Sequence, residues 1–542
     1  QLNQEVRISS KFNGPLNFSV GGNFMHYETH ENYYVFFNSL TMFASKTLDN
    51  WTPGNPATQD QCVDNMRPTD PQNPGSPGSF ICLGWVDVNP IDKLDDKGHN
   101  YFLSQNPYVL NSHAGFGEAY YDVMQDLKLT GGLRWTQDQK HFVTIPSALL
   151  TQGYGYPITG VVDQEWREWT GRFAANWTPQ LSFTDQTLVY ASFGHGYKAG
   201  GANPPGAILT VFNRFGEIAS PAHPLTFKPE FINAYELGTK NTMLDGAITF
   251  NATTFYYDYK AYQISEIVDR TSINLNFDAT VRGAELEAKW EAAPGLKFGF
   301  SGGYQKTRLA DGSKAIDLMD RTAGRSDWMV VKPFVSQASN CVLPVYVMAE
   351  YFRPGNNIYT GTSYACGIAY TLGRDPLLYT EPNPPFTPVL SPDYPGFDPV
   401  SPTATNGGAG PVPNGGAGFD KDLSGNELPN APHFTASFTA EYSMPISQQW
   451  AATLHSDFYW QSKSWARVFN DNPYDRLRGY KNVNLSLILT SQDGWQAMGY
   501  LKNVFNTTAI TGTFLNSDDS GLTTNVFLTD PRLFGVRITK NW

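Results

Sequence analysis

The chain has 542 residues, of which 14% are aromatic and only 16% are charged, and its formal net charge is −12. The negative charge argues against a nucleic-acid partner. The sequence also contains no apolar run of about 18 residues, which excludes a helical membrane protein. Few charges combined with many aromatic and glycine residues are unusual for a soluble enzyme, and no break in composition divides the chain into domains.

Segments of alternating apolar and polar residues recur along the chain, and this period of two predicts β-strands. Counting them gives about fifteen strands. They are expected near residues 2–10, 15–30, 112–123, from 127 onward, 166–178, 187–200, 232–243, 247–263, 275–292, 296–308, 432–443, 450–468, 480–491, 495–506 and 532–542.

The alternation separates two different environments. In one strand the first face is apolar and consists of Ala284, Leu286, Ala288 and Trp290. The second face consists of Gly283, Glu285, Glu287 and Lys289. A strand of this kind is typical of a sheet that meets lipid on one side and water on the other.

Short and long connections follow one another along the chain. Short turns are expected near 11–15, 124–126, 179–185, 244–246, 294–295, 445–449 and 493–494. Long segments are expected at 31–105, 139–165, 201–231, 309–431 and 507–525. This rhythm predicts an all-β fold, a transmembrane antiparallel β-barrel with short periplasmic turns and long extracellular loops. A soluble β-sandwich is the alternative, but it does not require the short and long rhythm.

The four cysteines fall into two close pairs, each inside a polar segment rich in Pro and Gly. We expect two local disulfides, Cys62 with Cys82 and Cys341 with Cys366, which implies an oxidising compartment. Four independent thiols are the alternative. No Cys-x-x-Cys or nearby histidine spacing supports a zinc site.

Several segments occur in the same order as in a known family. They are YASFGHGYKAGG, KPEFINAYELGTKN and RGAELEAKW between residues 190 and 290, followed by GYLKNVFNTT and DPRLFGVRITKNW near the C-terminus. In these segments the chain resembles the barrel of TonB-dependent outer-membrane receptors, which import scarce nutrients such as ferric siderophores. The resemblance covers most of the chain apart from the long loops.

The resemblance implies a larger assembly in the bacterial outer membrane. Family members have 22 strands around an N-terminal plug that contacts the TonB complex. We find no plug-like sequence, TonB box or signal peptide here, and about seven strands are missing from the family's number. We therefore expect the C-terminal part of a 22-stranded barrel, whose plug and first strands lie on another chain or were removed or left out. Expected partners are that N-terminal part, the TonB complex through the plug, outer-membrane lipid and lipopolysaccharide, and a small chelate or nutrient.

The last strand carries apolar residues on one face and ends on an aromatic residue. Phe534, Val536, Ile538 and Trp542 resemble the signal that the barrel-assembly machinery of Gram-negative bacteria reads. Lys540 interrupts this face, and its ammonium group is expected to reach the membrane boundary. An ordinary edge strand is the alternative.

Aromatic and charged residues at the outer mouth are the candidates for ligand contact. They are Tyr197, Lys198, Tyr257, Tyr259, Tyr262, Arg321, Arg325, Trp328, Arg353, Trp465 and Arg467. Routine interface aromatics are the alternative for the tyrosines. No cofactor is expected. The carboxylate groups Asp95-Asp96, Asp311/Asp317/Asp320 and Asp518-Asp519 lack a full calcium-ligand spacing, which favours solvated loop charges.

Two functions remain open. The first is active import by a TonB-dependent receptor, with a ferric siderophore as the default substrate. The second is a passive porin or a structural surface barrel without a plug. The sequence shows no catalytic constellation, so no enzyme is expected.

Overall fold

A computed structural model describes residues 1–34, 103–144, 160–203, 210–212, 218–221, 226–268, 271–332, 340–352, 403, 405–516, 518 and 521–542. Of the predicted site residues, Arg353, Cys62, Cys82 and Cys366 lie outside these ranges.

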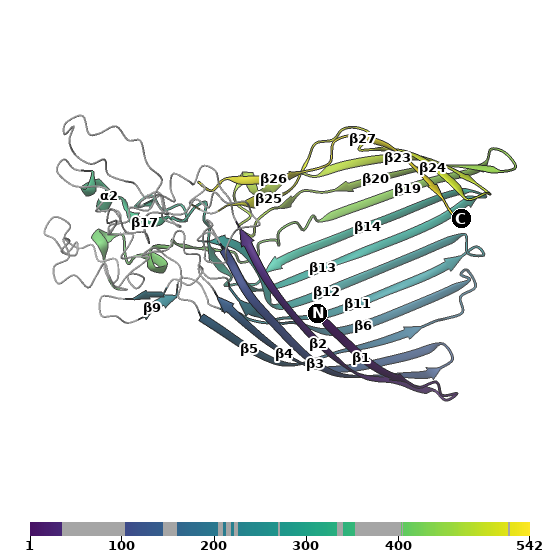
Figure 1. The fold of residues 1–542 in the computed structure, drawn as a ribbon, viewed down its shortest axis with the longest axis horizontal. Coiled ribbons are helices and arrows are strands. Elements are labelled where there is room, and N and C mark those ends of the chain that lie inside the picture. Colours follow the sequence, from purple (N-terminus) through teal and green to yellow (C-terminus); the bar gives the residue numbers. More distant parts are fainter. Residues whose placement is uncertain are drawn as a thin grey trace, which may run out of the picture.

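The fold is dominated by one antiparallel sheet of 15 strands, here called the wall (Figure 1). Each strand pairs with the next wall strand along the chain, which confirms the predicted barrel meander and its strand number. The wall strands, in order, are β1 (Leu2–Ser9), β2 (Leu16–Tyr34), β3 (Leu103–Met124), β4 (Leu127–Thr144), β5 (Gly160–Trp177), β6 (Gln186–Lys198), β11 (Glu230–Met243), β12 (Ile248–Val268), β13 (Thr271–Ala293), β14 (Leu296–Leu309), β19 (Phe434–Pro445), β20 (Trp450–Gln461), β23 (Tyr480–Ser491), β24 (Trp495–Lys502) and β27 (Leu533–Lys540).

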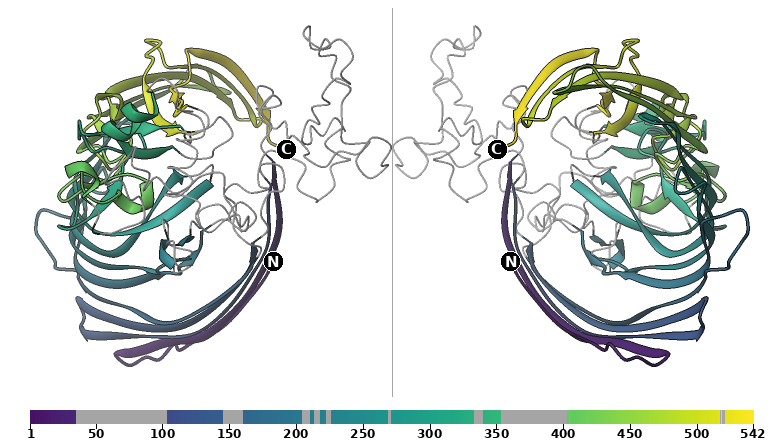
Figure 2. Two further views of the ribbon diagram at one scale, coloured as in Figure 1. Left: turned by 90° about the vertical axis from the view of Figure 1, so that its left-hand side faces the viewer. Right: turned by 90° about the vertical axis from the view of Figure 1, so that its right-hand side faces the viewer.

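The wall curls around a central space, with β1 and β27 as its two edge strands (Figure 2). Short turns join the strands at one end, and the long connections leave from the other. In the turn after β11, Leu244, Asp245 and Gly246 have φ values of 56°, 53° and 85°. Such left-handed backbone matches the twist of a tight hairpin. The Asp185 carboxylate of the neighbouring turn accepts the Gly246 N–H at 2.9 Å.

The predicted alternation is present in the wall. Leu133, Trp290, Phe434 and Phe438 lie on the outer face and are 64%, 49%, 48% and 43% exposed, respectively. Thr130 and Thr136, one step away from apolar neighbours, face inward and are buried. A band of large exposed apolar side chains is stable only against hydrocarbon, so the outer face is the lipid face.

Several strands are longer than expected and continue past the membrane. β12 and β13 have 21 and 23 residues, whereas about ten residues are enough to cross a bilayer. Their pairing contains a bulge between Tyr259 and Tyr262, where Ala261 has a φ of 54°. The Asp278 carboxylate accepts the Ala261 N–H at 2.9 Å and holds the bulge in place.

The bulge reverses which residues face inward. Below it, Tyr257 and Tyr259 face inward, and above it Tyr262, Ile264 and Glu266 do so, each opposite an inward residue of β13. Two tyrosines at an odd spacing therefore share one face.

The main hydrophobic core lies beyond the wall. The described loop residues 310–332, 405–433 and 462–479 pack on the upper ends of β12–β14. Residues 340–352 join them through the pairing of 341–344 with 328–331, and Asp518 joins them through Arg321; we call this assembly the cap. Its core joins Phe277 and Leu309 of the wall strands to Leu423, Val468 and Phe469 of the loops. Burying each large side chain stabilises the cap by about 1.5–3 kcal/mol.

Short elements organise the cap. They are β15 (Lys314–Ile316) paired with β18 (Asp420–Asp422), β16 (Trp328–Val331) paired with β17 (Cys341–Pro344), β21 (Ser464–Trp465) paired with β22 (Arg476–Leu477), and α2 (Val345–Tyr351). None of the helices in the described part of the chain is long and apolar enough to cross a membrane.

The C-terminal strand β27 is the exposed edge after β24. Phe534, Val536 and Ile538 are between 68% and 86% exposed, and Trp542 is fully exposed. The Lys540 ammonium lies 5.2 Å from the Trp495 ring centroid and 5.6 Å from that of Trp542, and it donates to the Asp493 carbonyl. The ammonium group of Lys540 thus lies at the turn, and the apolar row of Phe534, Val536 and Ile538 is not interrupted by charge.

Candidate functional site at the extracellular mouth

The inner side of the wall forms a cavity of about 990 Å³ where β3–β6 approach the extracellular end. Tyr197 and Lys198 line it together with Arg134, Asp138 and Lys140 of β4. The structure therefore brings the two predicted residues of β6 to the same cavity as a row of charged side chains.

Hydrogen bonds hold the upper tip of β6 over this cavity. The Gln263 amide donates to the carbonyls of Ala199 and Lys228, both at 3.1 Å. The Lys140 ammonium donates to the Gly200 carbonyl at 2.6 Å. A Cβ atom at Gly200 would collide with the Phe227 carbonyl, so only glycine permits this close approach.

Positive charge predominates in the cavity. Its lining contains five cationic side chains and two carboxylates. Arg172 is bound to Glu118, and the guanidinium groups of Arg7 and Arg134 lie 5.2 and 5.7 Å from the Phe116 ring centroid. An anionic ligand with aromatic or apolar parts is the complement of such a surface.

The three candidate tyrosines of β12 lie elsewhere on the inner face. The Tyr257 hydroxyl donates to Glu236 at 2.8 Å. Tyr259 and Tyr262 meet edge to face, with ring centroids 5.2 Å apart, and pack on the core of the cap. Tyr257 thus ties β12 to β11, whereas Tyr259 and Tyr262 pack where the wall meets the cap.

A second cavity of about 260 Å³ lies between β12, β13 and the cap. Its lining is mostly apolar and includes Phe277 and Phe469, with Glu266 and Arg467 as the charged members. Burial raises the pKa of Glu266 to about 7, and the nearby Asp317 adds to this, while Arg321 and Arg467 oppose it.

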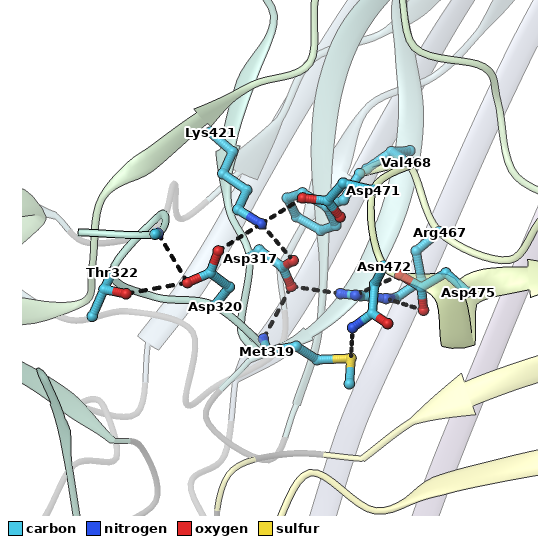
Figure 3. A network of polar contacts seen from close by, with 12 residues as sticks. Asp317, Met319, Asp320, Thr322, Lys421, Arg467, Val468, Asp471, Asn472 and Asp475 are labelled. Atoms are coloured by element: carbon cyan, nitrogen blue, oxygen red, sulfur yellow. Dashed lines mark hydrogen bonds and ion pairs between the residues drawn. The ribbon is translucent and has the colours of Figure 1, made fainter. Parts of the chain in front are cut away.

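Two cations of the cap collect carboxylates from separate loops (Figure 3). The Lys421 ammonium lies 2.6 Å from Asp471, 2.9 Å from Asp320 and 3.3 Å from Asp317. The Arg467 guanidinium lies 2.7 Å from Asp317 and 2.6 Å from Asp475.

The electrostatics of this network favour the charged lysine. Burial opposes the charge of Lys421, but the hydrogen bonds to Asp471 and Asp320 and the charge of Asp317 outweigh it and raise the lysine pKa. The expectation of solvated loop charge is wrong for Asp317 and Asp518, which are 1% and 3% exposed. The part of the chain that the structure describes contains no metal-holding group of three or more acidic, histidine or cysteine side chains.

The remaining described candidates, Arg321, Arg325, Trp328 and Trp465, lie in separate contacts within the cap. Arg321 is 1% exposed, bound to Asp518 and, at 2.6 Å, to the Ala417 carbonyl. Trp328 is buried and packs edge to face on Phe419, over which exposed Arg325 also lies. Trp465 lies in β21, with the Arg476 guanidinium 5.9 Å from its ring.

Cys341, at the start of β17, is buried and disulfide-bonded. Its predicted partner Cys366 lies outside the described residues, so the pairing stays a prediction.

Sequence reasoning missed the most informative residues of the larger cavity. Arg134 and Lys140 were not among the ligand candidates, although their even spacing places both on the polar face of β4. The alternation that identified the lipid face could have found them. Lys421 carried no local signal, and Asp518 was noted only as one of two adjacent loop carboxylates, which does not show that it binds Arg321.

A membrane-spanning antiparallel wall with short turns, long outer loops and a polar inner cavity is the architecture of an outer-membrane β-barrel protein. The chain belongs to the TonB dependent receptor-like, beta-barrel family, whose model matches residues 3–504. This family consists of transport receptors of the bacterial outer membrane and not of enzymes.

Individual relatives support the same family. The chain is 26% identical over 239 residues to the pesticin receptor of Yersinia enterocolitica, covering 43% of this chain and 32% of that receptor. Among solved structures, it resembles the ferric yersiniabactin uptake receptor FyuA from Yersinia pestis, with a TM-score of 0.54, 13% identity, and coverage of 98% of this chain and 52% of that one. The siderophore receptor PiuA from Acinetobacter baumannii gives a TM-score of 0.53, 12% identity, and coverage of 98% and 54%. The chain therefore spans about half the length of these solved receptors.

Proposed function

We propose that this chain forms the barrel wall and outer mouth of a receptor that binds a scarce nutrient and imports it with energy from TonB. A ferric siderophore is the default substrate. The cavity of about 990 Å³ beside Tyr197 and Lys198, with its excess of cationic side chains, carries the proposal. Anionic chelates are the substrates that this charge attracts.

The cap supports the same function. A mouth that selects one ligand needs loops held in a defined geometry, and the Lys421 and Arg467 ion pairs together with the hydrophobic core supply this. The names of the relatives, which include a ferric yersiniabactin uptake receptor and a siderophore receptor, agree with an iron chelate.

Uptake of radiolabelled ferric siderophores by cells that express the full-length receptor tests the proposal. We expect uptake of at least one siderophore, and we expect it to cease in cells without TonB. Uptake that continues at full rate without TonB would establish the passive porin instead. If growth depends on the receptor with cobalamin or sugars and not with iron sources, the proposed substrate is cobalamin or a sugar instead of a ferric siderophore.

A further inference from the structure

The lipid face of the wall is hollowed into an apolar groove of about 710 Å³ that crosses β11–β14, β19 and β20. Small residues form much of its floor: Ala252, Gly302 and Ala436 lie in one register row with Leu286, and Ala284 lies one step above this row on β13. Leu237, Phe300, Tyr304, Phe434 and Trp460 line its sides. The volume lies within the range of about 300–1,000 Å³ that is usual for small-ligand sites.

Two cations lie directly above this groove, on the same outer face. Arg282 is two residues beyond Ala284 on β13, Lys306 is two residues beyond Tyr304 on β14, and the two are register partners. Both are exposed. They lie toward the extracellular end, level with Tyr256, which pairs with Arg282, and one step above Tyr304 and Phe434.

Neighbouring carboxylates on this face are already engaged. Asp258 and Asp278 lie 3.4 and 3.3 Å from the Lys260 ammonium. Asp311 lies 2.6 Å from the Arg308 guanidinium. Among the residues that the structure describes, Arg282 and Lys306 form no ion pair, so the local excess of charge is positive and open to the membrane boundary.

The apolar groove and the two cations can be satisfied by one kind of ligand. The groove is complementary to hydrocarbon, since contact between water and so apolar a surface is unfavourable. The cations, placed where headgroups lie, need an anion such as phosphate. Only an amphiphile meets both needs from one molecule, and the lipid of the outer leaflet faces this end of the wall.

We propose that Arg282 and Lys306 bind a phosphate of one phosphorylated, acylated lipid of the outer leaflet, and that an acyl chain of this lipid fills the groove. The site goes beyond nutrient import. It would fix a boundary lipid against the strands that carry the cap.

Native mass spectrometry of the full-length receptor, released from detergent and titrated with bisphosphorylated lipid A, tests the site. The double variant Arg282→Gln/Lys306→Gln should bind this lipid at least about tenfold more weakly, because two phosphate contacts are lost. Lipid A without phosphates should bind both proteins equally weakly. The matched control is Lys297→Gln, which removes a lysine at the opposite end of β14.

The groove has its own test. Ala284→Trp fills the floor and should weaken binding of lipid A while leaving the cations in place. Inorganic phosphate alone should not compete at millimolar concentration, since it lacks the acyl chain. The retention of a folded barrel by each variant is checked by its heat-dependent mobility in gels.

Two outcomes would overturn the proposal. In the first, lipid A binds the double variant as tightly as the unchanged receptor. In the second, the Ala284→Trp variant binds as before, or free phosphate competes fully, either of which means that the groove holds no chain.

Discussion

Arg321 and Asp518 form an ion pair that is almost completely buried in the cap and that joins positions 197 residues apart. Asn340 strengthens it, because its backbone N–H donates to the same carboxylate at 3.0 Å. Breaking one half of a buried pair is costly, whereas replacing both halves is much less so.

Arg321→Met is expected to destabilise the cap by about 3–5 kcal/mol, because it leaves the Asp518 carboxylate buried without its cation. Hydrogen exchange of residues 310–332 measures the local loss. The double variant Arg321→Met/Asp518→Asn should recover most of it. Arg325→Met, which removes an exposed ion pair with Asp327, is the control and should cost less than about 1 kcal/mol. Equal effects of the two arginine variants would contradict the role of the buried pair.

The cap should become more stable as the pH falls from 8 to 5, because of Glu266. Its carboxyl has a raised pKa of about 7 in the folded cap. Between the unfolded value of about 4.3 and 7, the folded cap therefore binds more protons than the unfolded one, and stability falls as pH rises. The difference amounts to at most about 3 kcal/mol. Hydrogen exchange between pH 5 and 8 should show this slope, and Glu266→Gln should flatten it.

Asp320 supplies a control of opposite sign. Burial favours its neutral form, but hydrogen bonds from Lys421, Gly324 and Thr322 hold its pKa below the ordinary value. Its contribution is present above the unfolded pKa of about 3.9 and is lost as pH falls through the lower folded value. Asp320→Asn should thus leave the slope between pH 5 and 8 unchanged. If it removes that slope, Glu266 is not the titrating group.

Lys198→Gln and Arg134→Gln should each weaken binding of an anionic ferric siderophore by about fivefold, since each removes one cation from the lining of the larger cavity. Raising the salt concentration should reduce the difference. Fluorescence quenching during titration of the full-length receptor measures the affinity. Lys289→Gln, a lysine paired with Glu287 outside this cavity, is the control. Unchanged affinity in both variants would place the ligand elsewhere.

Leu237→Arg should destabilise the barrel in lipid vesicles by about 2–4 kcal/mol, because Leu237 is 58% exposed on the lipid face. Ser192→Arg is the matched control, since Ser192 lies on the inner face opposite Glu236 and the new charge meets a carboxylate. Chemical unfolding in vesicles compares the two. A greater loss for the serine variant would invert the assignment of the faces.

Peptide mapping without reduction should recover Cys341 linked to Cys366. Cys341 is buried in the cap and disulfide-bonded, and a closed loop of this length stabilises a fold by about 3 kcal/mol. Reduction should accordingly speed proteolysis of the cap while the wall stays protected. Linkage of Cys341 to Cys62 or Cys82 would contradict the local pairing.

The wall was readable from the sequence because alternation is a local property. Leu133 and Trp290 indicate the lipid face because charged residues lie one position away and apolar residues lie two positions away. The short turns indicate where the strands end. The cap was not readable in this way. Arg321 and Arg467 looked like ligand contacts because nothing near them in the sequence shows the carboxylates that they bind, and Asp518 lies 197 positions from Arg321.

The bulge at Ala261 divides β12 into two halves with different inward-facing positions. Below the bulge, every second side chain faces the hydrocarbon of the bilayer and must be apolar. Above the bulge, the alternation of inward and outward side chains is shifted by one residue, so Ile264 and Glu266 face the interior of the cap. One inserted residue thereby decides which side chains of the outer half of β12 meet the cap, and deleting it would move Ile264 and Glu266 to the opposite face while leaving the membrane-spanning half of the strand unchanged.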